Sequence, residues 1–365
     1  MIFGNSFGDN IQVTTFGESH GKCIGAVIEG FPANINVDVD IIQDMLDIRK
    51  PSNHVGSTSR KEPDKIEILS GVLNGTTLGT PIAFIIKNTN QHSDDYENLK
   101  NIFRPGHADF SYFEKYGIYD YRGGGRASAR NTASIVAAGG FAKQLIFQHF
   151  NNNKQPKLNN NDDIENTKNI SVIAKLIQVG NATNANDIEN LLQEVKLDGD
   201  SIGGMVECTI TNLPAGIGEP VFAKLQAMLA YAMLSIPAAK GFEYGHGFDS
   251  IFMHGSENND SYTACTSDNT FNTPSNCSSK ITSITPRTNN AGGILGGIST
   301  GLPITFRVAF KPIASIAKQQ QTVDNNGKKT NIKIKGRHDV CCAVRAVPVV
   351  EAMVYLVLAD LIEHL

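Results

Sequence analysis

The residues best suited to chemistry lie in one arginine- and glycine-rich run, YDYRGGGRASARNT, at residues 119–132. It contains three consecutive glycines at residues 123–125, flanked by Arg122, Arg126 and Arg130. Glycine lets a ligand approach the backbone closely, a helix N-terminus favours anions, and guanidinium groups match phosphate and carboxylate oxygens. Because clustered arginines without nearby acids need an anion to neutralise them, the run predicts an anion-binding loop. Ordinary loop geometry is the alternative, and the spacing matches neither a Walker loop nor Gly-x-Gly-x-x-Gly.

Titratable residues stand in three other turns of the chain. His20 lies in FGESHG, His107 lies in RPGHAD, and His338 and Asp339 lie in KGRHDVCCAVRAVP. Each turn combines a titratable group with arginine or glycine, although a lone histidine near a strand is more often structural. A zinc site is the rival interpretation of the three histidines. No pair of them has metal-ligand spacing and no cysteine is positioned to help, so we expect no metal.

A further glycine-dense stretch, NNAGGILGGISTGLPITFRVAFKPIASI, spans residues 289–316. One interpretation is a tightly packed turn that enters a buried strand. The other is a flat ligand that lies against the glycine backbone, with Lys311 and Ser315 making polar contacts at the end of the strand. The spacing alone does not decide between them.

Six of these motifs follow one another along the chain: FGESHG, RPGHAD, YRGGGRASAR, AGGILGGIS, KPIAS, and GRHD followed by RAVP. In this order the sequence resembles the chorismate synthase family across nearly its whole length. The resemblance implies an α/β (α+β) fold, a single-domain β-α-α-β sandwich of two similar halves over residues 1–365. It also implies a homotetramer that binds reduced FMN.

The reaction that the resemblance implies is the anti 1,4-elimination of phosphate from 5-enolpyruvylshikimate-3-phosphate, which gives chorismate. It is the last common step of the shikimate pathway to the aromatic amino acids and involves no net redox change. The family is thought to use reduced flavin to lend an electron and recover it, while the protein supplies position and proton management. Some members reduce the flavin themselves with NAD(P)H. No additional nucleotide-binding domain is evident in this sequence, so we expect it to need an external flavin reductant.

The resemblance also assigns roles to particular residues. It implies that His20 keeps the reduced flavin in its productive protonation state, and that His107 protonates the substrate or the departing phosphate. Asp339 would act on the flavin N5 proton so that N5 can serve as a base, and Ser19 and Ser128 would hydrogen-bond flavin or substrate. The expected flavin contacts are Arg126, Ala127, Ser128, Pro237, Ala238, Gly296, Lys311, Pro312, Ile313, Ala314, Ser315 and Arg337. The expected contacts with the substrate anions are Arg49, Arg104, Arg130 and Arg345.

Several positions depart from the usual pattern of the family. Ala127 stands where serine is common and Pro237 where asparagine is usual, which affects side-chain contacts with flavin but leaves backbone contacts in place. Val340 replaces the proline that normally follows GRHD. An arginine usual shortly after Pro51 is replaced near Val55, so one substrate or nicotinamide contact stays unassigned.

Two other classes of function are compatible with parts of the sequence. The first is an RNA- or phosphate-binding module, since Arg-Gly-Gly runs occur in such proteins. The chain has one such run, no Trp and a formal net charge of -4, which argues against this class. The second is a flavin oxidoreductase with net hydride transfer.

Composition indicates an ordinary globular protein. The 365 residues are 41% hydrophobic, enough for one large core or two medium ones. The N-terminus does not match a signal peptide, and the apolar run at residues 344–365 contains charged residues and a proline, which favours a buried helix over a membrane span. The six cysteines show no CxxC spacing. We therefore expect a cytoplasmic protein with reduced thiols that binds neither nucleic acid nor membrane.

Alternation and helical periodicity predict the elements that position these residues. We expect strands at residues 25–29, 66–73, 81–87, 171–179 and 204–211, and helices at residues 38–48, 128–150, 187–195 and 219–234. The arginine-glycine run is therefore a loop that enters a helix. Polar excursions are expected near residues 151–169, 256–285 and 319–335, the second as a loop and the third with a hairpin around Ile332 and Ile334.

Overall fold

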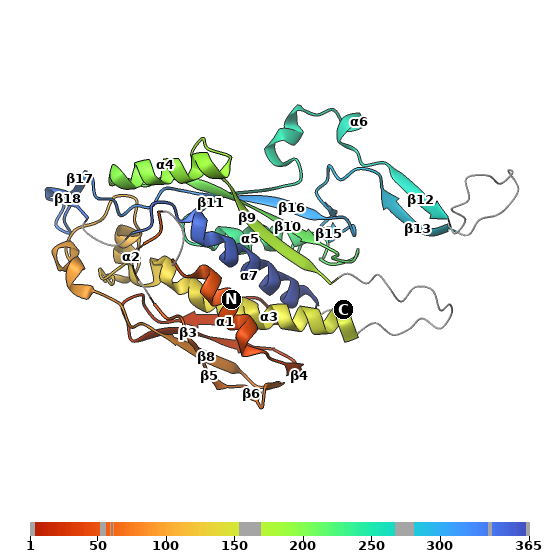
Figure 1. Ribbon diagram of the computed structural model, residues 1–365, viewed down its shortest axis with the longest axis horizontal. Coiled ribbons are helices and arrows are strands. Elements are labelled where there is room, and N and C mark those ends of the chain that lie inside the picture. Colours follow the sequence, from red (N-terminus) through yellow and green to blue (C-terminus); the bar gives the residue numbers. More distant parts are fainter. Residues whose placement is uncertain are drawn as a thin grey trace, which may run out of the picture.

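Two antiparallel sheets form the outer layers of the molecule, and long helices pack between them (Figure 1). The structure is a computed structural model that describes residues 4–51, 56–58, 60, 62–152, 169–266, 281–334 and 338–362. The first sheet has the strand order β1-β2-β3-β8-β5 and the second the order β11-β16-β10-β9. The arrangement confirms the expected mixed fold with β-α-α-β layers.

The first sheet comes from the N-terminal part of the chain. Its strands are β1 Ser6–Phe7, β2 Gln12–Phe16, β3 Cys23–Glu29, β5 Ile66–Ser70 and β8 Ile82–Lys87. Ile82, Phe84 and Ile86 of β8 are fully buried, whereas the residues between them are more exposed. Side chains alternate across a strand, so every second residue of β8 points the same way. The buried residues therefore form one face of the sheet, and this face packs toward the helices. A smaller sheet of β4 Ala33–Asn36, β6 Val72–Leu73 and β7 Thr76–Leu78 lies in the same part of the chain.

The second sheet is built from β9 Ser171–Val179, β10 Gly204–Thr211, β11 Ala239–Tyr244 and β16 Ile304–Phe310. Val206 and Cys208 of β10 and Phe306 and Val308 of β16 are buried and paired across the two strands. A short hairpin of β14 Ile294–Leu295 and β15 Ile298–Ser299 precedes β16. The glycine-dense stretch is therefore a hairpin that leads into a buried strand.

The helical layer is dominated by α3 Thr132–Asn152 and α7 Ala343–Ile362, which pack against each other (Figure 1). α3 also packs on β3 and β8, and α7 packs on β9 and β10, so each helix covers one sheet. A Cβ atom at Gly139 of α3 would lie 2.5 Å from Cβ of Ala352 on α7, which explains a glycine within this helix. α1 Val39–Arg49 and α5 Leu225–Leu234 complete the layer. No helix in the described ranges is both long and apolar enough to cross a membrane.

Two expected helices begin later than their sequence pattern suggests. α3 starts at Thr132 instead of residue 128, after two 3-10 turns at Gly125–Ala127 and Ala129–Asn131. Ser128 is in an extended conformation between the turns and its hydroxyl accepts a hydrogen bond from the backbone N–H of Arg130. The stretch before α5 is not helical, because Val221 has a positive φ of 69° and Lys224 has a ψ of 136°, and α5 starts at Leu225. The expected strand at residues 66–73 is likewise divided between β5 and β6.

The polar excursions have different outcomes. The expectation of a loop at residues 256–285 is wrong in part, because β12 Tyr262–Thr266 pairs with β13 Ile281–Pro286 and α6 Gly255–Asn258 precedes them. Threonine and isoleucine favour strands even in a polar segment. The hairpin expected within residues 319–335 is confirmed as β17 Gln319–Val323 and β18 Lys329–Lys333. Residues 153–168 of the first excursion lie outside the described residues.

The remaining helices are α2 Asp109–Tyr116 and α4 Ala185–Leu197. The β17–β18 hairpin packs against the segment before α2 through a second, small apolar cluster of Tyr96, Leu99, Ile332 and Ile334. This cluster is separate from the main core. It holds the hairpin beside the residues that form the site.

Candidate active site

A cavity of about 550 Å³ lies where the segments that lead into α3 and α7 meet. Helix N-termini carry a partial positive charge, so two of them at one cavity favour an anionic ligand. Most of the residues expected at the site line this cavity. They are His20, Arg49, Arg104, His107, Arg126, Ala127, Ser128, Arg130, Pro237, Ala238, Lys311, Pro312, Ile313, Ala314, Ser315, Asp339 and Arg345.

Three expected residues are not in that set. Ser19 is fully buried and its hydroxyl donates to the carbonyl of Arg122. Gly296 lies in the turn between β14 and β15, and no other atom comes within 4 Å of the place where its Cβ would be. Arg337 lies outside the described residues.

The triple glycine makes room for two histidine rings. A Cβ atom at Gly123 would lie 2.8 Å from Nε2 of His20, and one at Gly124 would lie 2.9 Å from Nε2 of His107. Both glycines also have a positive φ, of 62° and 94°. Approach of the backbone to a ligand was the expected reason for these glycines. The structure shows that the histidine side chains occupy the space in which the missing side chains would stand.

Arg126 lines the cavity and its guanidinium is bonded to the protein. Its guanidinium donates to the carbonyls of Thr15 and Gly17 and to the hydroxyl of Thr15, at 3.2, 3.1 and 2.6 Å. These bonds attach the glycine-rich loop to the end of β2. Ala127 and Ser128 beside it remain on the cavity wall.

The four arginines expected to bind substrate are each paired with a carboxylate of the protein. Within the arginine-glycine run, Arg122 pairs with Asp120 and Arg130 with Asp64, so the premise that this run lacks nearby acids is wrong. Asp64 is the shared partner of Arg49 and Arg130, with Arg49 Nη2 at 3.0 Å from Oδ2 and Arg130 Nη1 on Oδ1. All three side chains are at most 5% exposed. Arg130 Nε also donates to Oδ1 of Asn88 at 2.8 Å. The guanidinium planes are therefore fixed before any ligand binds.

Burial is the main influence on the pKa of Arg49, which it lowers to about 10. The charge of Asp64 opposes this shift, and the charges of Arg345 and Arg130 add to it. The same two guanidinium groups, Arg49 and Arg130, hold the pKa of Asp64 below its ordinary value despite its burial. The cluster thus contains real repulsion between cations, which a bound anion would relieve.

Asn88 connects this cluster to the FGESHG motif. Its side-chain amide donates to the carbonyls of Glu18 and Gly21, at 3.1 and 2.9 Å, while its oxygen accepts from Arg130. His20 lies between these two carbonyl groups in the sequence. Its ring makes an edge-to-face contact with Tyr96, with the centroids 5.1 Å apart.

Arg60 and Glu62 are cavity residues that sequence reasoning missed. Arg60 donates to Oε1 of Glu62 from both Nε and Nη2, at 3.0 and 2.7 Å, and to the carbonyl of Ser19 at 3.2 Å. Glu62 also accepts two bonds from Thr89, at 2.8 and 2.9 Å. Arg60, Glu62 and Asp64 belong to the charged segment RKEPDK just before β5, and no local spacing in that segment separates the cavity residues from the other charged ones.

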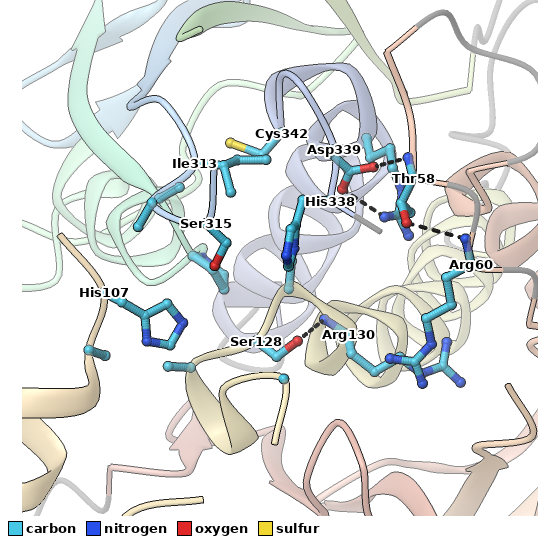
Figure 2. Close-up of a pocket in the computed structure, with 18 of the residues that line it drawn as sticks. Thr58, Arg60, His107, Ser128, Arg130, Ile313, Ser315, His338, Asp339 and Cys342 are labelled. Carbon is cyan, nitrogen blue, oxygen red and sulfur yellow. Dashed lines mark hydrogen bonds and ion pairs between the residues drawn. The ribbon is translucent and has the colours of Figure 1, made fainter. Parts of the chain in front are cut away.

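Asp339 and His338 face the cavity from the segment before α7, opposite His107 (Figure 2). The Asp339 carboxylate accepts from the backbone N–H of Thr58 at 2.8 Å and from Arg345 Nη1 at 2.9 Å. His338 was only a rejected zinc ligand in the sequence. Burial, followed by the charge of Arg104, lowers the pKa of His338 to about 4, so this ring is neutral near pH 7.

A second wall of the cavity is formed by small and apolar side chains, with one ammonium group. It contains Ala127, Ala238, Pro312, Ile313 and Ala314, and Cys342 lies next to Ile313 in Figure 2. Lys311 donates to the carbonyl of Gly106 at 2.6 Å, which joins the end of β16 to the RPGHAD turn. Burial raises the pKa of the Cys342 thiol to about 12, so it is not a thiolate at neutral pH.

The lining residues within the described ranges include six arginines and Lys311, but three carboxylates, Glu62, Asp64 and Asp339. The cavity therefore carries a surplus of positive charge although the chain as a whole is acidic. No group of three or more His, Cys, Asp or Glu in the described part of the chain is arranged to hold a metal ion. A cavity of this size and charge suits a small ligand with several acidic groups.

Fixed cationic groups and three histidines around one cavity together indicate an enzyme that acts on a small anion. The family model for chorismate synthase matches residues 11–362. The chain is 48% identical over 361 residues to the chorismate synthase of Christiangramia forsetii, which covers 98% of this chain and 97% of that protein. The chorismate synthase of Phocaeicola vulgatus is 47% identical over 369 residues, with the same two coverages. A crystal structure of chorismate synthase superposes with a TM-score of 0.70 at 27% identity, covering 98% of this chain and 93% of that chain.

The chain therefore belongs to the chorismate synthase family. It is a lyase of aromatic amino acid biosynthesis, and five of the six motifs that suggested the resemblance contribute residues to one cavity, the exception being AGGILGGIS.

Proposed function

We propose that the enzyme converts 5-enolpyruvylshikimate-3-phosphate to chorismate and phosphate by an anti 1,4-elimination that requires reduced FMN without net redox change. The observation that carries the proposal is the meeting of His20, His107 and Asp339 with a set of buried arginines around one cavity. Such a substrate has one phosphate and two carboxylates. A cavity with a surplus of guanidinium groups compensates the cost of removing these anions from water.

Arg49, Arg104, Arg130 and Arg345 are the residues we assign to the substrate anions. Each is held by a carboxylate or carbonyl of the protein, so little side-chain entropy is lost when a ligand binds. Arg60 is a fifth candidate, because its guanidinium lines the same cavity next to Glu62. It supplies a cation near the segment where the usual arginine after Pro51 is missing.

The wall of small residues fits a flat flavin ring. Ala127, Ala238 and Ala314 have no side chain long enough to prevent a planar group from lying against the backbone. Ser128, Lys311 and Ser315 would supply polar contacts, with Lys311 suited to the phosphate of FMN. When bound, reduced FMN supplies the electron that makes loss of the allylic phosphate feasible.

Proton management falls to three residues of the protein. His20 lies beside Gly123 and is the group we assign to the protonation state of the flavin. His107 is the group we assign to the departing phosphate, because Arg104 and Lys311 lie close to it. Asp339 is held in one orientation by Thr58 and Arg345, as a group that exchanges a proton with flavin N5 must be.

Chorismate formation tests the proposal. The purified protein should form chorismate anaerobically from 5-enolpyruvylshikimate-3-phosphate and FMN reduced with dithionite. It should form none with NADPH and oxidised FMN alone, because we assign flavin reduction to an external reductant. Absence of chorismate in the first experiment would refute the proposed reaction. Turnover in the second would refute the need for an external reductant only.

We further propose a homotetramer in the cytoplasm. Phe248, Ile251 and Phe252 are more than 70% exposed on one 3-10 segment at Gly247–Phe252, and such an apolar cluster suits an interface between copies of the chain. The described cysteines, Cys23, Cys208, Cys341 and Cys342, are free thiols, which fits a reducing compartment.

A further inference from the structure

Asp109 is a buried carboxylate that binds both Arg104 and His107. Its Oδ2 accepts from Nε and from the backbone N–H of Arg104, at 2.6 and 3.2 Å. Its Oδ1 accepts from Nη2 of Arg104 at 2.7 Å and lies 2.7 Å from Nδ1 of His107. The side chains of Arg104 and Asp109 are 2% and 3% exposed, so water does not weaken these bonds.

We infer that Asp109 is the positioning residue for His107, because it holds the imidazole as the Nδ1–H tautomer and so keeps Nε2 unprotonated. The inference rests on the proposed role of His107 in the reaction and adds a residue to it. Nε2 is the ring nitrogen next to Gly124, where it can take up a proton and pass it on.

The direction of the hydrogen bond follows from the charge of Asp109. Two nitrogens of the Arg104 guanidinium bind the carboxylate, and these bonds, together with the one to His107, hold the pKa of Asp109 well below its usual range. A carboxylate that carries no proton can only accept. The hydrogen between Asp109 and His107 therefore belongs to Nδ1, and Nε2 of the neutral ring has a free lone pair.

The groups around His107 set when it becomes charged. Burial lowers its pKa, the Asp109 bond opposes this, and Arg104 and Lys311 add to the lowering. His338 faces it across the cavity and is itself neutral near pH 7. Before an anion binds, His107 is therefore largely neutral near pH 7. A phosphate dianion next to Nε2 favours the imidazolium, with Asp109 as its counter-charge, so the proton is taken up as the ligand binds.

A purely structural role for Asp109 is the alternative, since it is the first residue of α2 and binds the backbone of Arg104. A structural residue affects stability and substrate binding. It does not determine which ring nitrogen of His107 carries the proton. The tautomer of His107 therefore distinguishes a positioning role of Asp109 from a purely structural one.

Asp109→Asn is the decisive substitution. Oδ2 faces two donors of Arg104 whereas Oδ1 faces one, Nη2, so the amide oxygen takes the Oδ2 side and the amide NH₂ faces His107. That NH₂ donates to Nδ1 and moves the ring proton to Nε2. We expect kcat to fall roughly 10²-fold or more, the usual scale of acid-base catalysis, with KM changed far less. Asp109→Glu keeps an ionised acceptor and should recover part of the loss. Asp198→Asn removes the same charge from an exposed pair with Lys318 and should keep full activity.

The tautomer is measured directly by ¹⁵N NMR of histidine-labelled enzyme, with His107 assigned by its disappearance in His107→Ala. We expect Nδ1 protonated and Nε2 unprotonated in the unaltered enzyme, and the reverse in Asp109→Asn. An Nε2–H tautomer in the unaltered enzyme would overturn the inference even if Asp109→Asn fails to fold. So would an Asp109→Asn enzyme with unchanged kcat. The spectrum requires no turnover, so it tests the tautomer of His107 even if the proposed reaction is wrong.

Discussion

Nε2 of His20 lies 2.8 Å from the point where Gly123 would carry a Cβ atom, and His107 stands in the same relation to Gly124. The imidazole rings of FGESHG and RPGHAD thus pack against two consecutive glycines of the arginine-glycine run. The loop at residues 123–125 is shaped by the histidines that it receives. Its arginine neighbours serve other parts of the site, since Arg126 binds the end of β2 and Arg130 binds Asp64.

Gly124→Ala tests this relation. The added methyl group would displace the ring of His107, and we expect activity to fall roughly 10²-fold, the scale of a displaced reacting group. Gly327→Ala is the matched control, because Gly327 also has a positive φ, of 78°, but no atom within 4 Å of its would-be Cβ. It carries the backbone strain without the collision and should keep its activity. Equal loss in both variants, measured by steady-state kinetics, would attribute the effect to backbone strain.

Asp64→Asn should strongly destabilise the fold. It removes the charge that compensates two buried guanidinium groups, those of Arg49 and Arg130. Breaking a buried ion pair on one side typically costs about 3–5 kcal/mol. Denaturant unfolding of this variant should show that loss, whereas Glu67→Gln, at the exposed pair with Lys87, should unfold like the unaltered protein. A small effect of Asp64→Asn would mean that the arginines find other partners.

Stability should decrease as the pH falls from about 6.5 to 4. His338 has a folded pKa of about 4, below the ordinary value of about 6.5, because burial disfavours its charged form. Between these values the unfolded chain binds a proton that the folded protein does not, so lowering the pH favours unfolding. Each pKa unit corresponds to about 1.4 kcal/mol. His338→Gln should flatten the pH dependence of unfolding in this window, and replacing the exposed His246 should not. An unchanged slope in His338→Gln would place the titrating group elsewhere.

Replacing Phe252 by serine should weaken the proposed tetramer. Phe252 is 81% exposed and lies beside two further apolar residues, Phe248 and Ile251, so burying it between subunits removes a large apolar area from water. Sedimentation at low concentration should detect smaller species for Phe252→Ser. Leu197 is 90% exposed on α4 and is a control outside this segment, so Leu197→Ser should sediment normally. A monomer in the unaltered protein would refute the tetramer itself.

Local patterns predicted much of the fold. The ranges expected for β9 and β10 are those observed, and the apolar C-terminal run forms α7. Element starts were less predictable where the backbone departs from the local preference, as at Val221 before α5. The ordered motifs indicated the site because five of the six contribute residues to the cavity wall.

The electrostatic organisation of the site could not be predicted in the same way. Asp64 pairs with Arg49 and Arg130, which stand 15 and 66 residues away in the sequence. Such partners are chosen by tertiary contact, and no local spacing encodes them. The bonds of Asp109 to both Arg104 and His107 were easier to predict from the sequence, since all three residues belong to RPGHAD.

The most direct test of the proposed chemistry is the ratio of chorismate formed to FMN supplied, measured anaerobically with reduced FMN in small amount and substrate in large excess. An elimination without net redox change predicts many chorismate molecules and an equal number of phosphates per FMN, with the flavin still reduced at the end. One product molecule per flavin, with the flavin left oxidised, would contradict the proposed reaction and indicate net hydride transfer instead.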